Sequence, residues 1–227
     1  MSFSDLPARL AEVRGRIADA AARGGHGQRV TIVAVTKTHG PEAVEAAWSA
    51  GVGAVGENRV QEALAKMERV SVPARWHLIG HLQRNKAKAA ARFALVHSLD
   101  SARLADALHE VGMREERALE VLVQVNVSAE ESKGGYSLDE LPAEAERLTA
   151  LHGIRVAGVM TMAPLDADEW VLRRVFSGAR EAREMLTSAG HPAYELSMGM
   201  SGDYEIAVEE GATMVRLGTV LFGARSA

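Results

Sequence analysis

The chain has 227 residues, of which 47% are hydrophobic, and its 26 basic and 30 acidic side chains give a formal net charge of −4. This length suits one α/β domain, the charge balance excludes the basic surface typical of nucleic-acid binding, and the lack of cysteine excludes disulfides and thiolate metal sites. No charged-then-apolar leader opens the chain and no apolar stretch is long enough for a membrane span, so we expect a cytoplasmic protein that binds neither nucleic acid nor membrane.

Helical patterns and apolar runs alternate along the chain. A helix is predicted over Asp5–Arg23, where Leu6, Leu10, Val13 and Ile17 recur at spacings of three and four residues. Eight apolar runs then predict strands at Val30–Lys37, Gly53–Asn58, Arg75–Gly80, Leu95–Asp100, Glu120–Val127, Arg155–Met162, Glu195–Met200 and Met214–Gly218.

The segments between these strands carry helix start and stop signals. Ser101 is predicted to cap a helix over Arg103–Val111 that stops at Gly112. Ser137–Glu140 matches a capping box ahead of a further helix, and Asp168–Ser188 is the longest periodic stretch.

Eight strands, each followed by a helix-like segment, predict an α/β fold: a single (β/α)8 TIM barrel with an extra N-terminal helix. We expect one domain, 1–227, in which residues 1–28 form the helical segment before the first strand. An open doubly wound sheet is the alternative, and it is weaker because no GxGxxG motif follows the first strand.

Lys37 ends the first predicted strand, whose β-branched and apolar residues are typical of a strand buried on both faces. The carboxyl ends of barrel strands carry catalytic and cofactor-binding groups. A lysine that is partly desolvated there is an activated amine, which can form a Schiff base with an aldehyde. The alternative is a strand-end lysine whose amine reaches into solvent.

Small and hydroxyl residues follow the seventh and eighth predicted strands, at Ser197–Asp203 and Gly218–Gly223. Backbone N–H groups, a helix N-terminus and a hydroxyl donor suit a phosphate dianion, and barrels often place this site after strands seven and eight. One glycine-serine loop is weak evidence, because turns use these residues anyway. Two such loops beside Lys37 indicate a phosphorylated aldehyde as the ligand.

Five motifs, recurring in order, carry a family resemblance. They are Val33–Thr38, Gly56–Glu62, Trp76–Lys86, Met198–Ser201 and Val215–Thr219. Together they resemble the pyridoxal phosphate homeostasis protein family, also called the proline synthetase co-transcribed homologues, over about Val30–Arg225. The resemblance implies the alanine-racemase-like barrel (fold type III of the pyridoxal phosphate proteins) without the racemase's second, β-rich domain. It also implies pyridoxal 5'-phosphate (PLP) as the cofactor.

The resemblance assigns site residues as well. Lys37 matches the lysine that forms the Schiff base with PLP. Arg216 matches the arginine near the pyridine nitrogen, where a permanent positive charge disfavours ring protonation and weakens the cofactor as an electron sink. The other predicted cofactor-binding residues are the phosphate donors Ser201, Gly218 and Thr219 and the ring-facing Asn58. No catalytic residue is assigned.

The sequence departs from the common family pattern at Thr36, Gly202 and Tyr204. None of these changes removes the lysine or the phosphate donors, but Tyr204 is expected to alter what covers the cofactor. The segment 130–135 follows the fifth predicted strand, and we expect it to form a mobile lid around Lys133.

Other candidate residues have structural explanations. His77, His81 and His97 lie near strand ends, but no carboxylate cluster accompanies them, so we expect no metal site. Glu57 ends a strand, where it either pairs with a base or serves as a hydrogen-bond acceptor. Trp76 is expected to be a packing residue.

Three functions compete. The first is a non-catalytic carrier that holds PLP as a Schiff base and influences the pools of B6 vitamers and amino acids. Amino acids or PLP-requiring apo-enzymes are its expected further partners, and a monomer is expected. The second is a PLP-dependent amino-acid racemase, which needs a second acid/base group opposite Lys37, and only Tyr136, Tyr194 and Tyr204 are available. The third is a Schiff-base aldolase on a phosphosugar, for which no acid/base network is visible. We prefer the carrier.

Overall fold

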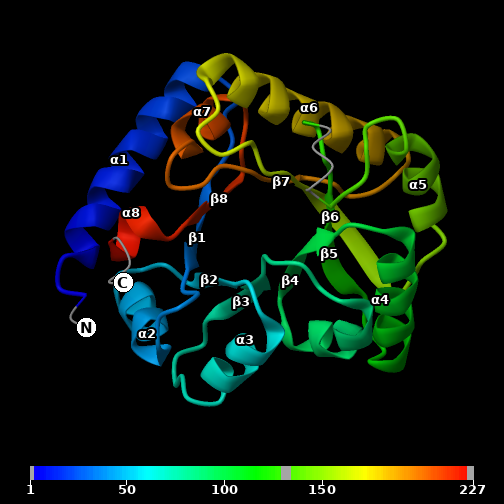
Figure 1. Ribbon diagram of the computed structural model, residues 1–227, viewed down its shortest axis with the longest axis horizontal. Coiled ribbons are helices and arrows are strands. Elements are labelled where there is room, and N and C mark those ends of the chain that lie inside the picture. The colour runs from blue at the N-terminus through cyan, green and yellow to red at the C-terminus, as the bar shows by residue number, and fades with distance from the viewer. Residues whose placement is uncertain (1–2, 129–133, 224–227) are drawn as a thin grey trace.

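The apolar runs of the sequence form eight parallel strands that close into one barrel, in the order β1 to β8 (Figure 1). The computed structural model describes residues 3–128 and 134–223. The strands are β1 (Thr31–Val35), β2 (Ala54–Glu57), β3 (Arg75–Leu78), β4 (Leu95–Leu99), β5 (Leu119–Gln124), β6 (Ile154–Met160), β7 (Glu195–Ser197) and β8 (Met214–Leu217). Because β1 pairs in parallel with both β2 and β8, the (β/α)8 prediction is confirmed and the doubly wound alternative is wrong.

Helices surround the barrel: α1 precedes β1, and one helix follows each strand (Figure 1). They are α1 (Leu6–Gly24), α2 (Pro41–Ser49), α3 (Val60–Met67), the 3₁₀ helix η1 (Arg84–Arg92), α4 (Ala102–Arg114), α5 (Leu141–Leu148), α6 (Glu169–Ser188), α7 (Tyr204–Glu209) and α8 (Thr219–Phe222). None of the helices within residues 3–128 and 134–223 has the length and apolar character of a membrane span.

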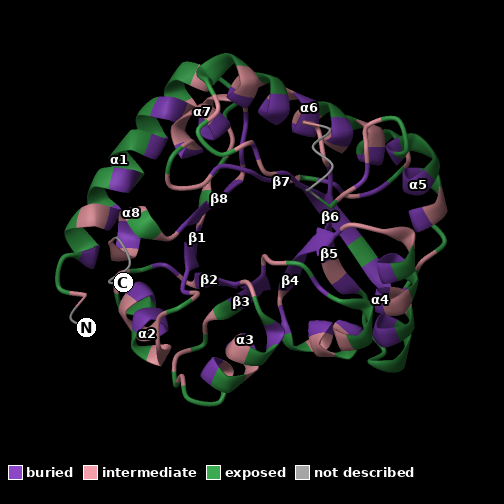
Figure 2. Ribbon diagram, viewed as in Figure 1, coloured by how far each residue is buried: buried purple, intermediate pink, exposed green. Residues whose placement is uncertain are grey.

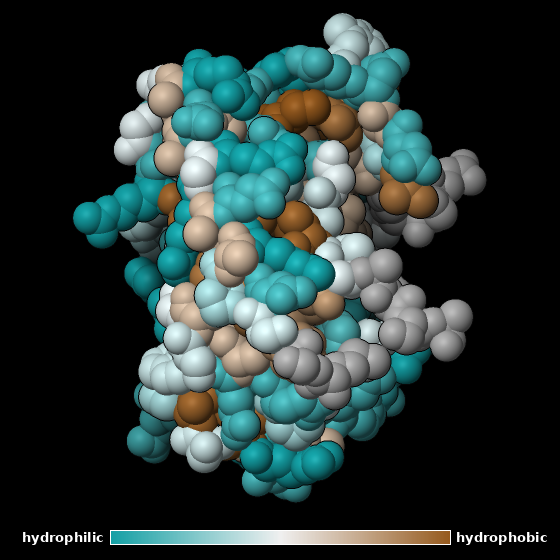
Figure 3. All heavy atoms as spheres, turned by 90° about the vertical axis from the view of Figure 1, so that its left-hand side faces the viewer, coloured by the Kyte–Doolittle hydropathy of each residue, from teal (hydrophilic) through white to brown (hydrophobic). Residues whose placement is uncertain are grey.

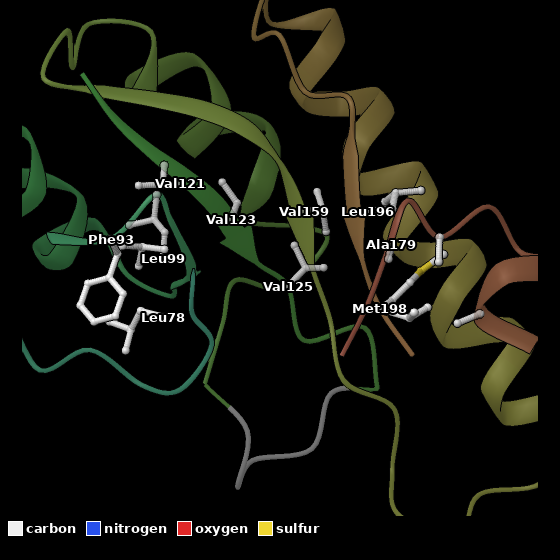
Figure 4. Packing of buried hydrophobic residues seen from close by; sticks show 14 of the residues in the cluster. Leu78, Phe93, Leu99, Val121, Val123, Val125, Val159, Ala179, Leu196 and Met198 are labelled. Atoms are coloured by element: carbon white, nitrogen blue, oxygen red, sulfur yellow. The ribbon is translucent and has the colours of Figure 1, made fainter. Parts of the chain in front are cut away.

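Two buried apolar clusters lie on opposite sides of the strands. The larger one fills the space between the strands and the helices, and Figure 4 shows part of it, including Leu78 and Leu196. The smaller one lies on the inward faces of the strands and includes Val33, Leu122 and Met214. In β1, for example, Val33 belongs to the interior cluster and the next residue, Ala34, to the cluster beneath the helices, as the alternation of a closed barrel requires. Figure 2 shows the result, a buried ring of strands inside helices whose outer faces are exposed.

The N-terminal helix α1 lies outside the last part of the barrel, against α7 and α8 (Figure 1). Its apolar stripe is buried as the spacing predicts, and Leu10 and Val13 are each 1% exposed. Arg16 and Arg23 on its polar side form ion pairs with acidic residues of α7 at 2.5 and 2.6 Å. The face seen in Figure 3, to which the left-hand side of Figure 1 is turned, is mainly hydrophilic, with apolar residues in separate small patches.

The predicted capping box has its expected form, and a second cap, at Asp168, appears in the structure alone. In the capping box, the Ser137 amide donates to the Glu140 carboxylate at 2.9 Å and the Glu140 amide donates to the Ser137 hydroxyl at 3.2 Å. The box precedes α5. Asp168 caps α6 by accepting a hydrogen bond from the Val171 amide at 2.9 Å.

The predicted stop at Gly112 is wrong, because α4 continues to Arg114. A Cβ atom on Gly112 would overlap the carbonyl oxygen of Gly153, and a Cβ atom on Gly153 would overlap the carbonyl oxygen of His109. Glycine at 112 therefore serves close packing of α4 against the segment before β6 rather than ending the helix. Ser101 occupies the N-cap position but makes no side-chain capping bond to the helix.

Candidate functional site

A cavity of about 450 Å³ opens among the loops that follow the carboxyl ends of the strands. Its walls come mainly from the loops after β1, β2, β6, β7 and β8. It is lined by Val35, Lys37, Asn58, Ile79, Met162, Pro164, Leu165, Asp166, Ala167, Leu172, Met200, Ser201, Gly202, Asp203, Arg216, Gly218 and Thr219. All six residues predicted to bind a cofactor are in this lining, so the fold brings them together, and their contacts with a cofactor stay predictions.

Lys37 lies in the turn that leaves β1, two residues after the last strand residue Val35. The next residue, Thr38, has a φ of 69°, a left-handed conformation that is uncommon for a β-branched residue. Such a conformation persists only where the surrounding structure holds it. The turn is therefore a fixed support for the lysine.

A buried ion pair holds the residue before the lysine. The Lys66 ammonium donates to the Thr36 carbonyl at 2.7 Å and to Glu57 Oε1 at 2.6 Å, and the Thr36 hydroxyl donates to the same carboxylate oxygen at 2.6 Å. Glu57 is fully buried and Lys66 is 8% exposed. Glu57 thus pairs with a base, one of the two alternatives that its sequence position allows, and the pair clamps the backbone beside Lys37.

Sequence reasoning missed Lys66. The signal was present, because Val60, Ala63 and Lys66 are spaced by three residues and are the three buried residues of α3. A lysine in phase with the apolar stripe of a short helix points to a buried carboxylate partner.

The loops after β7 and β8 meet at the cavity. The Val220 amide in α8 donates to the Ser201 hydroxyl oxygen at 3.3 Å, which joins the two predicted phosphate loops. Asp203 accepts a hydrogen bond from the Met200 amide at 2.5 Å and closes the turn that carries Ser201. Burial raises the pKa of Asp203. Hydroxyl and backbone donors therefore gather at this end of the cavity.

Arg216 lines the cavity and is 5% exposed. Its Nη1 donates to the carbonyl and to the hydroxyl of Ser197, each at 2.7 Å, and its Nη2 donates to the Thr161 carbonyl at 2.9 Å. Burial lowers the pKa of Arg216 to about 10, and the charge of Asp203 acts in the opposite direction. The guanidinium is therefore still a cation at neutral pH.

The three histidines do not converge on one point. His77 and His97 form a hydrogen bond at 3.0 Å in the barrel interior, whereas His81 contacts Asp100 at 2.8 Å at the exposed mouth. Within the described residues no group of three or more histidine and acidic side chains is placed to hold a metal ion. Trp76 packs in the larger apolar cluster, as expected.

The three tyrosines lie away from the cavity. The Tyr136 hydroxyl donates to Glu144 at 2.7 Å, and burial raises its pKa. Tyr194, just before β7, is 74% exposed at the opposite end of the barrel. Tyr204 is 3% exposed and its ring lies under Arg16 of α1, so it does not line the cavity itself, and its effect on what covers the cofactor stays a prediction. The predicted lid around Lys133 lies outside the described residues, and Tyr136 beyond it is tied to β5 by backbone hydrogen bonds.

The donor set fits PLP. A primary amine, a fixed guanidinium, two hydroxyls and the start of α8 all face one cavity, whose size lies in the range of small-ligand pockets. The hydroxyls and the loop amides suit a phosphate, the amine suits an aldehyde, and Ile79 and Met162 supply apolar surface for a ring. Another cavity, of about 480 Å³, lies between α1 and the amino ends of β1 and β2 and contains none of the predicted site residues.

Comparisons with known proteins identify relatives along the whole chain. Residues 9–226 match the family model of the alanine racemase N-terminal domain. The pyridoxal phosphate homeostasis protein of Aquifex aeolicus is 40% identical over 221 residues, which cover 96% of this chain and 97% of that protein.

Two solved structures are similar to this chain in fold. PipY of Synechococcus elongatus, in its structure with PLP bound, is 36% identical with a TM-score of 0.85, over 96% of this chain and all of that one. Alanine racemase from Corynebacterium glutamicum has a TM-score of 0.76 at 16% identity, over 98% of this chain and 62% of the racemase. The racemase likeness concerns the barrel fold alone.

Proposed function

This chain belongs to the pyridoxal phosphate homeostasis protein family, and from that premise we propose that it binds PLP and takes part in the intracellular homeostasis of PLP and other B6 vitamers. The observation that carries the proposal is that Lys37, Arg216 and the two phosphate-type loops line one cavity at the carboxyl end of the barrel. Within the lining, Ser201, Gly218 and Thr219 would bind the phosphate and Asn58 would face the ring.

PLP supplies an aldehyde that condenses with amines and a conjugated ring that withdraws electrons. The Lys37 amine, held by the turn after β1, would retain the cofactor as a Schiff base. Arg216 would place a permanent cation beside the ring nitrogen. A cation there disfavours protonation of that nitrogen, which weakens electron withdrawal and makes proton removal from a bound amino acid slow.

A carrier role fits the cavity better than a racemase role. Inversion needs an acid/base group on each side of the substrate carbon. Among the described lining residues, Lys37 is accompanied by no tyrosine and no histidine, and of the two carboxylates there, Asp166 and Asp203, the latter is already bonded to the Met200 amide. We therefore propose that the protein holds and releases PLP without efficient catalysis, as a single-domain monomer in the cytoplasm, with amino acids or PLP-requiring apo-enzymes as its further partners.

An absorbance spectrum of the purified protein tests the binding. We expect a yellow protein whose visible band disappears in Lys37→Ala and persists in Lys88→Ala, a control at an exposed lysine of η1. Borohydride reduction followed by peptide mapping is expected to place the label on Lys37. A label on Lys86 or Lys88 would overturn the assignment.

A chiral assay tests the lack of efficient catalysis. Alanine, serine and other amino acids are incubated with the PLP-loaded protein, and solvent-deuterium exchange at Cα is followed by NMR. Inversion at an ordinary enzymatic rate, on the order of 10 s⁻¹, would make the protein a racemase. Exchange without inversion would indicate that one base acts alone.

A further inference from the structure

A chain of hydrogen bonds crosses the barrel interior and ends at Arg216. The Arg216 guanidinium donates to the Ser197 hydroxyl oxygen at 2.7 Å, this oxygen lies 2.9 Å from His97 Nδ1, and His97 Nε2 lies 3.0 Å from His77 Nδ1. These residues belong to β8, β7, β4 and β3, so the chain joins opposite walls of the barrel. All four are buried, with exposures of 5% or less.

Counting the hydrogen-bond donors and acceptors gives the hydrogen-bond chain a direction. Arg216 can only donate, so the Ser197 oxygen accepts from it and the Ser197 O–H is free to donate to His97 Nδ1. His97 then carries its proton on Nε2 and donates to His77 Nδ1. His77 in turn carries its proton on Nε2, which is buried and has no hydrogen-bond partner among the described residues. In this arrangement one buried group is unsatisfied.

The opposite direction is less favourable. If His77 donated to His97 and His97 donated to Ser197, the Ser197 oxygen would accept twice and its O–H would lack an acceptor, while His77 Nε2 would be an unpaired acceptor. Two buried groups would then be unsatisfied, and each one costs free energy. The first direction also aligns each bond dipole with the field of the Arg216 cation, and aligned bonds strengthen one another.

Both imidazoles are neutral in this arrangement. Burial lowers the pKa of His77 to about 4, with a smaller effect of the Arg75 charge, and burial also holds the pKa of His97 well below its usual value. A second positive charge therefore does not form beside Arg216 at neutral pH. Arg216 is thus the single cation of this hydrogen-bond chain.

We propose that Ser197 and His97 are positioning residues that hold the Arg216 guanidinium in one orientation toward the bound cofactor, through a hydrogen-bond chain that runs from Arg216 to His77. This inference rests on the proposed PLP function. Within the described contacts three of the five guanidinium N–H groups are used, two on Ser197 and one on the Thr161 carbonyl. The remaining two have no hydrogen bond among the described contacts, and Arg216 lines the cavity.

The direction of the chain can be measured without any cofactor. Histidine side chains labelled with ¹⁵N report by NMR which ring nitrogen carries the proton. We expect His97 and His77 both to be neutral and protonated on Nε2 at pH 7. His97 protonated on Nδ1 would overturn the proposed direction.

Positioning is tested by PLP binding to matched variants. Ser197→Ala removes the hydroxyl but leaves the two carbonyl acceptors of Arg216, so PLP affinity is expected to fall about tenfold, or about 1.4 kcal/mol, and the visible band to shift. The control is Ser98→Ala, because Ser98 is also fully buried but its hydroxyl bonds the Gly80 carbonyl at 2.8 Å. Ser98→Ala is expected to keep the wild-type affinity and spectrum.

A pair of His97 variants supplies the rescue test. The Oδ1 of asparagine can take the place of His97 Nδ1 as an acceptor for the Ser197 O–H, whereas leucine cannot accept. His97→Asn is therefore expected to bind PLP more like the wild type, and His97→Leu to resemble Ser197→Ala. Thermal unfolding of the PLP-free variants establishes that all of them fold.

The outcomes separate the two proposals. If the wild type failed to bind PLP, the proposed function would fall, and the positioning role with it. If the wild type bound PLP and Ser197→Ala matched Ser98→Ala in affinity and spectrum, the positioning role alone would fall. Equal behaviour of His97→Asn and His97→Leu would also contradict it.

Discussion

Lys66→Met is the change that bears most directly on the segment carrying Lys37, the proposed cofactor lysine. The Lys66 ammonium is bonded to Glu57 at 2.6 Å and to the Thr36 carbonyl at 2.7 Å, and Glu57 is fully buried. Methionine keeps the length of the side chain but removes the charge, so a carboxylate is left inside the protein with the Thr36 hydroxyl as its remaining partner. Removing one partner of a buried pair destabilises a protein by about 3–5 kcal/mol.

The double variant Glu57→Met/Lys66→Met supplies the decisive comparison. Replacing both charges by apolar groups of similar volume is often nearly neutral. We therefore expect the double variant to be more stable than Lys66→Met, although it has one more substitution. The coupling between the two sites should amount to several kcal/mol, which a double-mutant cycle isolates.

Urea denaturation of the PLP-free proteins measures these free energies of unfolding. Lys88→Met, at an exposed lysine of η1, is the matched control and is expected to stay within about 0.5 kcal/mol of the wild type. A loss of less than about 1 kcal/mol in Lys66→Met would refute the reasoning, because it would mean that the buried carboxylate does not need its cation. Strict additivity in the double variant would refute it as well.

Three further predictions concern other parts of the molecule. Because burial lowers the pKa of His77 to about 4, the unfolded chain takes up a proton at a higher pH than the folded one. This contribution to stability is complete above about pH 6.5 and declines by roughly 3 kcal/mol as the pH falls to 4, so unfolding curves across this window should be flatter for His77→Gln than for the exposed control His81→Gln. Ser201→Ala combined with Thr219→Ala is expected to weaken PLP binding by roughly 2–4 kcal/mol, and calorimetry in which pyridoxal bound as tightly as PLP would argue against the phosphate loops. Gly112→Ala is expected to destabilise the fold by about 1–3 kcal/mol or more, since its methyl group would overlap the Gly153 carbonyl, whereas Gly15→Ala has open space around it and should not.

The sequence predicted the barrel because the apolar runs and the helical periods are local patterns. Their ends were less accurate: the first run continues to Lys37, whereas β1 ends at Val35 and Thr36 is buried beyond it. Apolar residues mark burial, and burial continues into the loops after backbone pairing stops. Gly112 was misread as a helix stop because the close approach of Gly153 comes from a segment 41 positions away, and no local pattern records it.

The candidate site likewise contains residues that the sequence could predict and contacts that it could not. Lys37 and the loops at Ser201 and Gly218 could be found because each sits at the end of a predicted strand, where barrels place ligand-binding groups. The contacts between His97 and Ser197, or between Tyr204 and Arg16, could not, since they join residues that are distant in the sequence. Which strand residues meet inside the barrel depends on the register between strands, and an apolar or polar pattern does not specify which individual residues come into contact there.

The pairing of β1 with β8 and the packing of α1 on α7 have a consequence for synthesis on the ribosome. The earliest helix and strand to emerge find their partners among residues 195–222, which are made nearly two hundred positions later. Until then β1 has an open edge and the apolar stripe of α1 has no surface to cover, so the nascent chain is exposed to misassociation. Ser201 and Thr219, which line the cavity together with Lys37, are also synthesised much later than Lys37. A nascent chain therefore acquires its complete binding cavity only after the final strand has been added, which favours PLP loading after translation rather than during it.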